Sequence, residues 1–271
     1  MIRIGTVLPG CRLFPEEGKD NRISTYQSYL EGFALREKLG IDFLESSVGT
    51  ALSLTDEEAA DLAAKGVIIE ALNCFIPGTF SIENPTPELE EHVKKTMKRA
   101  SVLGVETIVF GSGKARTMSE GLSDEQRTEK LVAFLRMCEP YAADAGVTVV
   151  IEPLNTSETN VANTVASGLA LAKAADCPHV RLLADVYHMF REPDPDAAVE
   201  SLAEALPYLR HIHLGSSDDR KTLRADDAYL RKCAEKLKAI GYSGRVSIET
   251  GFPRIPDDLL ASIKVESDLF R

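Results

Sequence analysis

The sequence predicts a single (β/α)8 barrel, a TIM barrel, over residues 1–271. Short apolar segments alternate eight times with amphipathic segments, and a glycine often separates an amphipathic segment from the next apolar one. Eight such units in a chain of this length are typical of the barrel. A doubly wound open sheet would more naturally carry a glycine-rich phosphate turn after its first strand. The segment Leu8-Pro9-Gly10-Cys11-Arg12 is not such a turn.

The apolar segments are expected to form buried parallel strands, because they are short and rich in branched aliphatic residues. In chain order they are Ile2–Val7, Ile41–Glu45, Val67–Asn73, Thr107–Phe110, Val147–Glu152, Val180–Asp185, His211–Leu214 and Arg245–Thr250.

Helices are expected between these strands, and several carry recognisable ends. Thr55-x-x-Glu58 and Ser123-x-x-Gln126 match the capping box, in which a hydroxyl and a carboxyl or amide satisfy free N–H groups. Thr86-Pro87 fits an N-cap followed by proline in the first helical position. Glycine accepts the left-handed conformation that closes a helix, and five glycines occupy such positions. They are Gly40, Gly66, Gly104, Gly146 and Gly241.

Composition narrows the class of protein. The chain has 31 basic and 42 acidic residues, a net charge of −11, which disfavours a nucleic-acid partner because such proteins need a basic surface. The five cysteines lie far apart without a C-x-x-C motif, so we expect reduced thiols. No signal-peptide pattern or apolar run of about 18 residues occurs. We therefore expect a cytoplasmic protein without a membrane partner.

Four ligand-type residues end the last four predicted strands. They are Glu152, Asp185, His213 and Glu249, and neighbours in this series are 28 to 36 residues apart, about one strand–helix unit. The carboxyl ends of barrel strands meet at one face, so the four side chains are expected to converge. One acid at a strand end is often a cap or an ion-pair partner, whereas four on consecutive strands predict a divalent metal ion. Oxygen ligands with one nitrogen favour Mn²⁺, Co²⁺ or Mg²⁺ and allow Zn²⁺.

Three further residues near these strand ends are candidates for binding substrate. His211 shares the face of His213 but lies one layer deeper, and we leave open whether it contacts substrate, supports the metal ligand or packs in the core. His188 follows Asp185 by three residues, and Glu158 lies in the loop after Glu152. Each of these two residues binds a substrate hydroxyl or has a structural role. In the structural role, His188 lies at the entry of a helix and Glu158 is solvated.

The ordered motifs of the second half resemble the xylose isomerase-like barrel superfamily, and above all its sugar (phosphate) isomerase/epimerase branch with the ketose 3-epimerases. They read I-E-P-L-N-x-x-E-T-N-x-x-N-T at 151–164, L-x-A-D-V-Y-H-M at 182–189, H-I-H-L-G at 211–215 and S-I-E-T at 247–250. The resemblance implies one divalent metal held by the four residues above. It also implies that Glu152 and Glu249 form the acid/base pair, and that Glu158 and His188 touch the sugar.

Two features depart from the ketose 3-epimerases. Their arginine six residues after the metal-binding histidine corresponds to Asp219, and Arg220 is one position further on. Arg220 is kept as a substrate-binding candidate. The segments 73–78 and 110–116 resemble a branch often described as sugar phosphate isomerases/epimerases. Lys114 or Arg116 is expected either to meet a phosphate or to be a solvated charge.

The resemblance implies a metal-dependent isomerase that moves a proton on the carbon alpha to a carbonyl, through an enediolate. The product is an epimer or an aldose–ketose pair, depending on where the proton returns. An inosose dehydratase, a hydroxypyruvate isomerase, a DNA-repair endonuclease and a non-catalytic sugar-binding barrel are the alternatives. A homodimer or homotetramer and a lid over residues 9–22 are further expectations.

Overall fold

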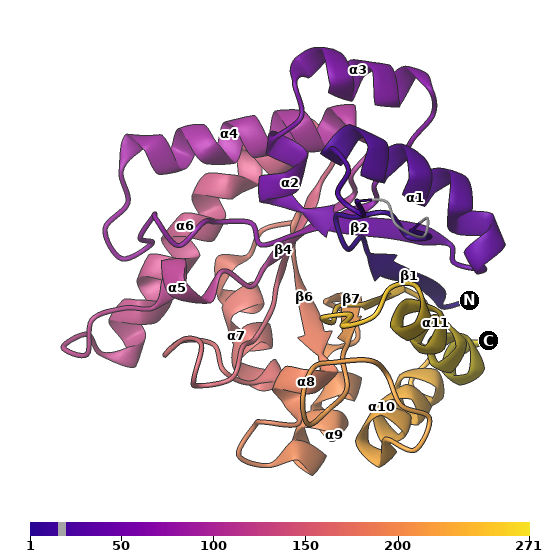
Figure 1. Cartoon of the computed structure of the whole chain (residues 1–271). Helices are drawn as coiled ribbons and strands as arrows, with labels where there is room; N and C mark the ends of the chain where they lie inside the picture. The colour runs from indigo at the N-terminus through magenta and orange to yellow at the C-terminus, as the bar shows by residue number, and fades with distance from the viewer. Residues whose placement is uncertain (16–19) are drawn as a thin grey trace.

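The computed structural model describes residues 1–15 and 20–271, and its eight strands form one closed parallel barrel in the order β1 to β8 (Figure 1). This confirms the predicted fold. The strands are β1 Arg3–Val7, β2 Phe43–Ser47, β3 Ala71–Asn73, β4 Thr107–Phe110, β5 Thr148–Ile151, β6 Val180–Asp185, β7 Leu209–Leu214 and β8 Arg245–Ile248.

Helices surround the barrel, and most of them return the chain from one strand to the next (Figure 1). They are α1 Thr25–Leu39, α2 Val48–Leu52, α3 Asp56–Ala64, α4 Pro87–Val102, α5 Gly113–Arg116, α6 Asp124–Ala145, α7 Val165–Ala175, α8 Val186–Met189, α9 Pro195–Ala205, α10 Ala228–Ala239 and α11 Asp257–Phe270. Both predicted capping boxes, at Thr55 and at Ser123, are present. The five predicted helix-closing glycines all have φ between 68° and 76°.

Three short helices, α2, α5 and α8, were not predicted, and each begins within a few residues of a strand end. Local side chains explain two of them. Ser47 caps α2 by accepting from the backbone N–H of Thr50, and Asp185 caps α8 by accepting from that of Tyr187. A residue that ends a strand thus also begins a helix, which shortens the loop and holds its side chain at the barrel mouth.

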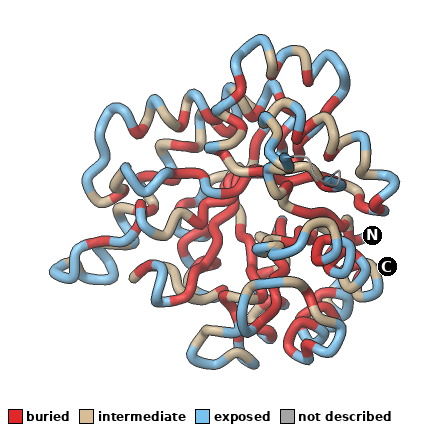
Figure 2. The backbone as a smooth tube through the Cα atoms, viewed as in Figure 1, coloured by how far each residue is buried: buried red, intermediate tan, exposed pale blue. Residues whose placement is uncertain are grey.

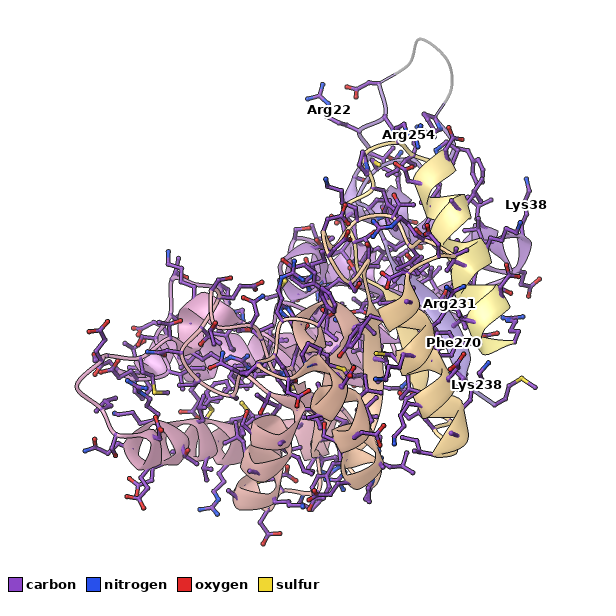
Figure 3. All side chains as sticks on the ribbon, turned by 90° about the horizontal axis from the view of Figure 1, so that it is seen from below. Arg22, Lys38, Arg231, Lys238, Arg254 and Phe270 are labelled. Atoms are coloured by element: carbon purple, nitrogen blue, oxygen red, sulfur yellow. The ribbon has the colours of Figure 1, made fainter. Side chains whose placement is uncertain are left out.

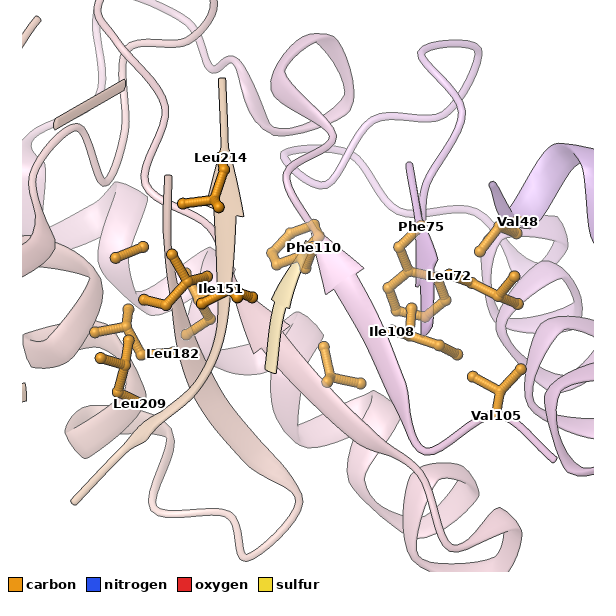
Figure 4. Close-up of a cluster of buried hydrophobic side chains, with 14 of the residues drawn as sticks. Val48, Leu72, Phe75, Val105, Ile108, Phe110, Ile151, Leu182, Leu209 and Leu214 are labelled. Carbon is orange, nitrogen blue, oxygen red and sulfur yellow. The ribbon is translucent and has the colours of Figure 1, made fainter. Parts of the chain in front are cut away.

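The main hydrophobic core lies between the barrel and its helices. Figure 4 shows the part of this layer in which Leu72, Ile108, Phe110, Ile151 and Leu182 leave their strands and meet side chains from the helices and loops. Figure 2 shows the strands buried along most of their length, whereas the helices alternate between buried and exposed residues. A second, smaller cluster lies apart from this layer and joins three neighbouring strands: Val109, Val150 and Leu183.

Polar groups occupy much of the barrel interior. At the amino-terminal end of the strands, Glu70 accepts from Arg3 and Arg245, whose side chains it joins across the barrel. Further along the axis, the ring of Phe43 fills the space beside Gly5, where a Cβ would lie 2.6 Å from Phe43 Cε1. Only glycine leaves that space, so Gly5 lets the ring close the barrel beneath the predicted metal ligands.

Three further expectations concern the cysteines, a membrane partner and a lid. The five cysteines are free. Within residues 1–15 and 20–271, none of the helices combines the length and the apolar character that crossing a bilayer requires. The predicted lid over residues 9–22 includes 16–19, which lie outside the described residues. The loops after β1 and β8, which carry Arg22 and Arg254, emerge at the same end of the molecule (Figure 3).

Glu266 is a fully buried carboxyl on α11 that packs against β1. Its Oε1 accepts from the backbone N–H of Gly5 at 3.4 Å, and Oε2 has no partner within the described part of the chain. Burial raises the pKa of this carboxyl well above its usual value. The native state therefore keeps Glu266 protonated at pH values where the unfolded chain has lost that proton.

Glu266→Gln is expected to make stability less dependent on pH. The native state binds more protons than the unfolded state above the ordinary glutamate pKa, so the free energy of unfolding of the parent protein falls as pH rises. The amide removes this contribution. Denaturant unfolding at pH 5 and pH 8 should show a gain for the variant at pH 8 that is larger than at pH 5. Asp268→Asn, at an exposed position of the same helix, is the matched control. Equal changes at both pH values would contradict a neutral Glu266.

Candidate metal centre and cleft

The four predicted metal ligands come together at the carboxyl end of the barrel. Glu152, Asp185, His213 and Glu249 each offer a ligand atom, and these atoms all lie within 4.8 Å of one another. Three of the residues are buried, and the Glu249 side chain is 18% exposed. Parallel pairing aligns them, because Asp185 is opposite His213 and each glutamate follows the last residue of its strand. One layer of inward-facing side chains thus contains all four.

The chemistry of this group fits a divalent cation. Glu152 Oε1 and His213 Nδ1 are buried atoms without hydrogen-bond partners, and both face the group, 3.5 Å apart. His213 Nδ1 also lies 3.1 Å from Glu249 Oε2. Unpaired buried acceptors and neighbouring carboxylates are costly without a compensating charge. A cation of the Mn²⁺, Co²⁺, Mg²⁺ or Zn²⁺ type satisfies all of these atoms at once.

Charges close by shift the acidities of this group. Burial raises the pKa of Asp185, and the nearby Glu249 adds to the rise. Burial also opposes ionisation of Glu249, but His213 and Arg220 outweigh it and hold the pKa of that carboxyl well below its usual value. Burial lowers the pKa of His213, yet Glu249 and Glu45 together raise it well above 6.5. The carboxylates thus favour a proton on His213, and a cation bound at Nδ1 would take the place of that proton.

Glu45 supports His213 from below and was not singled out from the sequence. Its Oε1 lies 3.0 Å from His213 Nε2, and its Oε2 lies 3.1 Å from His211 Nε2, with all three side chains fully buried. Burial raises the pKa of Glu45, but the two imidazoles outweigh it and lower the pKa to about 2. A carboxylate only accepts, so both Nε2 atoms donate to it. His213 therefore turns Nδ1 towards the metal group.

Of the three roles left open for His211, this arrangement fits the support of His213 and not a contact with substrate. The ring of His211 is fully buried beside Phe43, one layer below the cleft, and its Nε2–H is used by Glu45. His211 therefore donates to Glu45, which in turn accepts from His213.

Both glutamates of the group are held from outside it. Asn73 Nδ2 donates to Glu249 Oε1 at 2.8 Å, which leaves Oε2 to face the centre. Arg116 is fully buried and donates to the backbone oxygens of Phe110, at 3.1 Å, and Glu152, at 2.6 Å. Arg116 is therefore neither a phosphate contact nor a solvated charge, the two expectations for it, because its buried guanidinium joins the ends of β4 and β5. Gly111 leaves space for the Glu152 carboxylate, which would lie 2.2 Å from a Cβ there.

His188 presents an unpaired N–H to the centre. Its Nδ1 accepts from the backbone N–H of Asn155 at 3.1 Å, so the proton of the neutral ring is on Nε2. Burial lowers the pKa of His188 to about 4, which keeps it neutral at pH 7. Nε2 is buried without a partner and lies about 4 Å from carboxylate oxygens of Glu152, Glu158 and Asp185. Asn155 also donates to Glu158 at 3.2 Å and orients it.

Arg220 reaches the centre despite its shift by one position. Its Nη2 donates to Asp185 Oδ2 at 3.1 Å and contacts Glu249 Oε2, and Nη1 lies 3.9 Å from Glu158 Oε1. The residue has a left-handed backbone, φ 55°, which turns its side chain into the cleft, whereas Asp219 pairs with Lys221 and Arg224 outside. Tyr187 lies beneath this arginine, at 5.2 Å from ring centre to guanidinium carbon. The departure from the family pattern is therefore compensated by local backbone geometry.

A cleft of about 320 Å³ opens over the metal group. Glu152, Glu158, Arg220 and Glu249 line one side, and the loops after β3 and β4 line the other. Cys74, Ser112 and Arg220 at its rim all have left-handed φ values, between 43° and 55°. Such strain costs about 1–3 kcal/mol per residue and is typical of functional sites. Phe75, in the loop after β3, is fully buried in the core and does not line this cleft.

The residues that the sequence analysis missed are those that position others. Glu45, Asn73 and Asn155 each donate to or accept from a predicted ligand or substrate contact. Asn155 stands in the recognised motif at 151–164, and Glu45 and Asn73 end two predicted strands, so their places at the mouth were a usable signal. Their partners lie on distant strands, which only the closed barrel brings near.

The relatives found by comparison with known proteins are named as sugar epimerases. A D-psicose 3-epimerase of Ruminiclostridium cellulolyticum is 26% identical over 254 residues, 90% of this chain and 84% of the relative. An L-ribulose 3-epimerase of Methylomonas sp. is 32% identical over 140 residues, 52% of this chain, and the match spans about half of that relative. These relatives support the prediction of an enzyme of the isomerase class.

The solved structures agree in fold. The D-allulose 3-epimerase from Methylomonas sp. in complex with D-allulose superposes with a TM-score of 0.79 at 20% identity, covering 98% of this chain and 96% of that one. The family model described as xylose isomerase-like TIM barrel matches residues 33–265, which include most of the barrel and all four residues of the candidate metal group. The chain therefore belongs to the xylose isomerase-like TIM barrel family.

Proposed function

We propose that the chain is a divalent-metal-dependent sugar epimerase or isomerase that moves a proton on the carbon alpha to a carbonyl. One observation carries the proposal. Two glutamates from strands on different sides of His213, Glu152 and Glu249, bring carboxylate oxygens into one group with Asp185 and His213. Two carboxylates that face a shared space can act as base and acid, so that one removes a proton from one side of a carbon and the other returns it on the opposite side.

The residues that would hold the ion are Glu152, Asp185, His213 and Glu249, which is the set predicted from the sequence. A divalent cation bound there supplies charge that polarises a carbonyl and favours the loss of the neighbouring proton. Glu45 keeps His213 in the tautomer that leaves Nδ1 free for the ion, and Asn73 keeps one oxygen of Glu249 turned away from it.

The remaining polar groups of the cleft are suited to hold a sugar. His188 offers a neutral Nε2–H, Glu158 offers an acceptor, and Arg220 offers a fixed positive charge. Together they bind the hydroxyl and carbonyl oxygens next to the reacting carbon. In this pose Glu152 removes the proton and Glu249 returns it, or the reverse, depending on the handedness of the substrate.

The names of the relatives support a ketose 3-epimerase-like reaction, and the two glutamates support an epimer as the product. An aldose–ketose isomerase would use the same groups and return the proton to the neighbouring carbon. An inosose dehydratase or a hydroxypyruvate isomerase would also begin by removing a proton alpha to a carbonyl. The four reactions therefore differ in product and share the first step.

Solvent deuterium exchange tests the proposal. Metal-free protein is reloaded with Mn²⁺, Co²⁺ or Mg²⁺ and incubated in D₂O with ketoses, ketose phosphates and an inosose, while NMR follows the alpha proton. We expect metal-dependent uptake of deuterium, and the labelled carbon and the product identify the reaction. Metal content is measured in the same samples. A loaded protein that exchanges no proton in any of these compounds would contradict the proposal and favour a sugar-binding role.

A further inference from the structure

The loops after β3 and β4 are bound to each other and form one wall of the cleft. The backbone N–H of Ile76 donates to Ser112 Oγ at 2.8 Å, and that of Ile82 donates to Ala115 O at 2.9 Å. Further out, Ser119 donates to Glu83 through both its backbone N–H and its hydroxyl, each at 2.7 Å. These hydrogen bonds hold the two loops together, so the side chains on this wall have defined positions relative to the metal group.

Lys114 is the basic side chain that this wall presents to the cleft. It lines the same cleft as Glu152, Glu158 and Glu249. Its aliphatic stem lies over Gly78, where an added Cβ would be 2.7 Å from Lys114 Cδ and 3.1 Å from Cβ and Cγ. A side chain at position 78 would displace the lysine. Because Gly78 has no side chain, the aliphatic stem of Lys114 packs against its backbone and runs along the cleft wall.

The other cations near this cleft are already occupied. Arg220 pairs with Asp185 and Glu249 beside the metal group, and Arg116 is buried against backbone oxygens. Across residues 1–15 and 20–271, by contrast, the structure gives the Lys114 ammonium neither an ion pair nor a hydrogen bond, and the side chain is exposed. Ile76 and Leu154 line the same cleft, so part of the surface around an anion bound there is apolar.

We propose that Lys114 binds an anionic group, a phosphate monoester or a carboxylate, at the end of the sugar away from the reacting carbon. This inference rests on the proposed function and names the substrate class of the same cleft. A lysine ammonium binds a phosphate or carboxylate as a point charge. A sugar held by His188, Glu158 and Arg220 at its reacting end reaches across the cleft towards the wall that carries Lys114.

Three ketohexoses that differ only at C6 test the proposal: D-fructose, D-fructose 6-phosphate and D-fructuronate, each also offered as its C3 epimer. Binding to the metal-loaded protein is measured by calorimetry, and deuterium exchange is measured alongside it. We expect at least one of the two anionic forms to bind about 10- to 100-fold more tightly than the neutral sugar, as one charge-assisted contact provides. The phosphate and carboxylate arms identify which anion is preferred.

The variants separate the charge of Lys114 from its bulk. Lys114→Gln should weaken binding of the preferred anionic form 10- to 100-fold more than that of D-fructose, and Lys114→Arg should recover most of the loss. In kinetics the loss should appear mainly in KM. Lys98→Gln, at an exposed position on α4 away from the cleft, is the matched control and should leave all three sugars unchanged.

Three outcomes would overturn the inference: equal affinity for the charged and neutral sugars, an equal effect of Lys114→Gln on all of them, or no binding of either anionic form. Its failure is separable from that of the proposed function. Lys114-dependent binding without proton exchange would support the anion site and contradict the epimerase or isomerase. Exchange with D-fructose that is unaffected by the C6 group would support the epimerase or isomerase and contradict the anion site.

Discussion

Replacing either Glu152 or Glu249 with glutamine is expected to abolish the interconversion of two C3-epimeric ketoses. General acid–base catalysis by one positioned group contributes about 10²- to 10⁴-fold, so each variant should lose at least that factor. Glutamine keeps one oxygen for the metal group, and part of the metal should remain bound. Product formation followed by NMR, with metal content measured on the same protein, separates loss of chemistry from loss of the ion.

Deuterium uptake adds a finer expectation for the two variants. The glutamate that remains can still remove and return a proton on its own side of the carbon, so each variant should retain slow exchange with only one of the two epimers. The two variants should prefer opposite epimers, which would show which glutamate faces which side. Glu235→Gln, at an exposed position of α10, is the control. Full interconversion by either Glu152→Gln or Glu249→Gln would refute the assignment.

Glu45→Gln is expected to lower the affinity of the centre for its metal about 10- to 100-fold, the usual effect of removing a partner behind a metal-binding histidine. The carboxylate of Glu45 accepts from both His213 and His211, and an amide cannot accept from both in the same way. Competition with a chelating dye for Mn²⁺ or Co²⁺ measures the affinity, and ¹⁵N NMR of His213 reports which ring nitrogen holds the proton.

The control for this variant is Glu57→Gln, which changes an exposed glutamate in the first turn of α3. Thermal unfolding of both variants in the absence of metal measures any general loss of stability. A loss of metal affinity together with a changed His213 tautomer supports a positioning role for Glu45. Unchanged affinity in a folded Glu45→Gln protein would show that His213 needs no support from it.

The barrel itself was predictable because its information is local. Apolar runs, capping boxes such as that at Thr55, and closing glycines such as Gly146 each act within a few residues, and the capping boxes and glycines appear where expected. Strand boundaries moved by a few residues, most at β3, which begins at Ala71 and not at Val67. The short helix α2 was missed because its cap, Ser47, lies beyond the predicted strand Ile41–Glu45, and α8 was missed because Asp185 was predicted only as a strand end and metal ligand.

The candidate site also has one part that the sequence predicted and one part that only the structure shows. The sequence by itself predicted the four residues that meet at the ends of β5 to β8, because strand ends recur at the period of the barrel unit. Only the tertiary structure decided that Glu45 lies under His213, that Arg116 is buried whereas Lys114 is exposed, and that Arg220 reaches the centre through a left-handed turn. Ring closure joins residues that are far apart in the chain, such as Glu45 and His213 at 168 positions and Asn73 and Glu249 at 176 positions. No local pattern encodes such pairs, because burial and hydrogen bonding across the barrel select them only after it has closed.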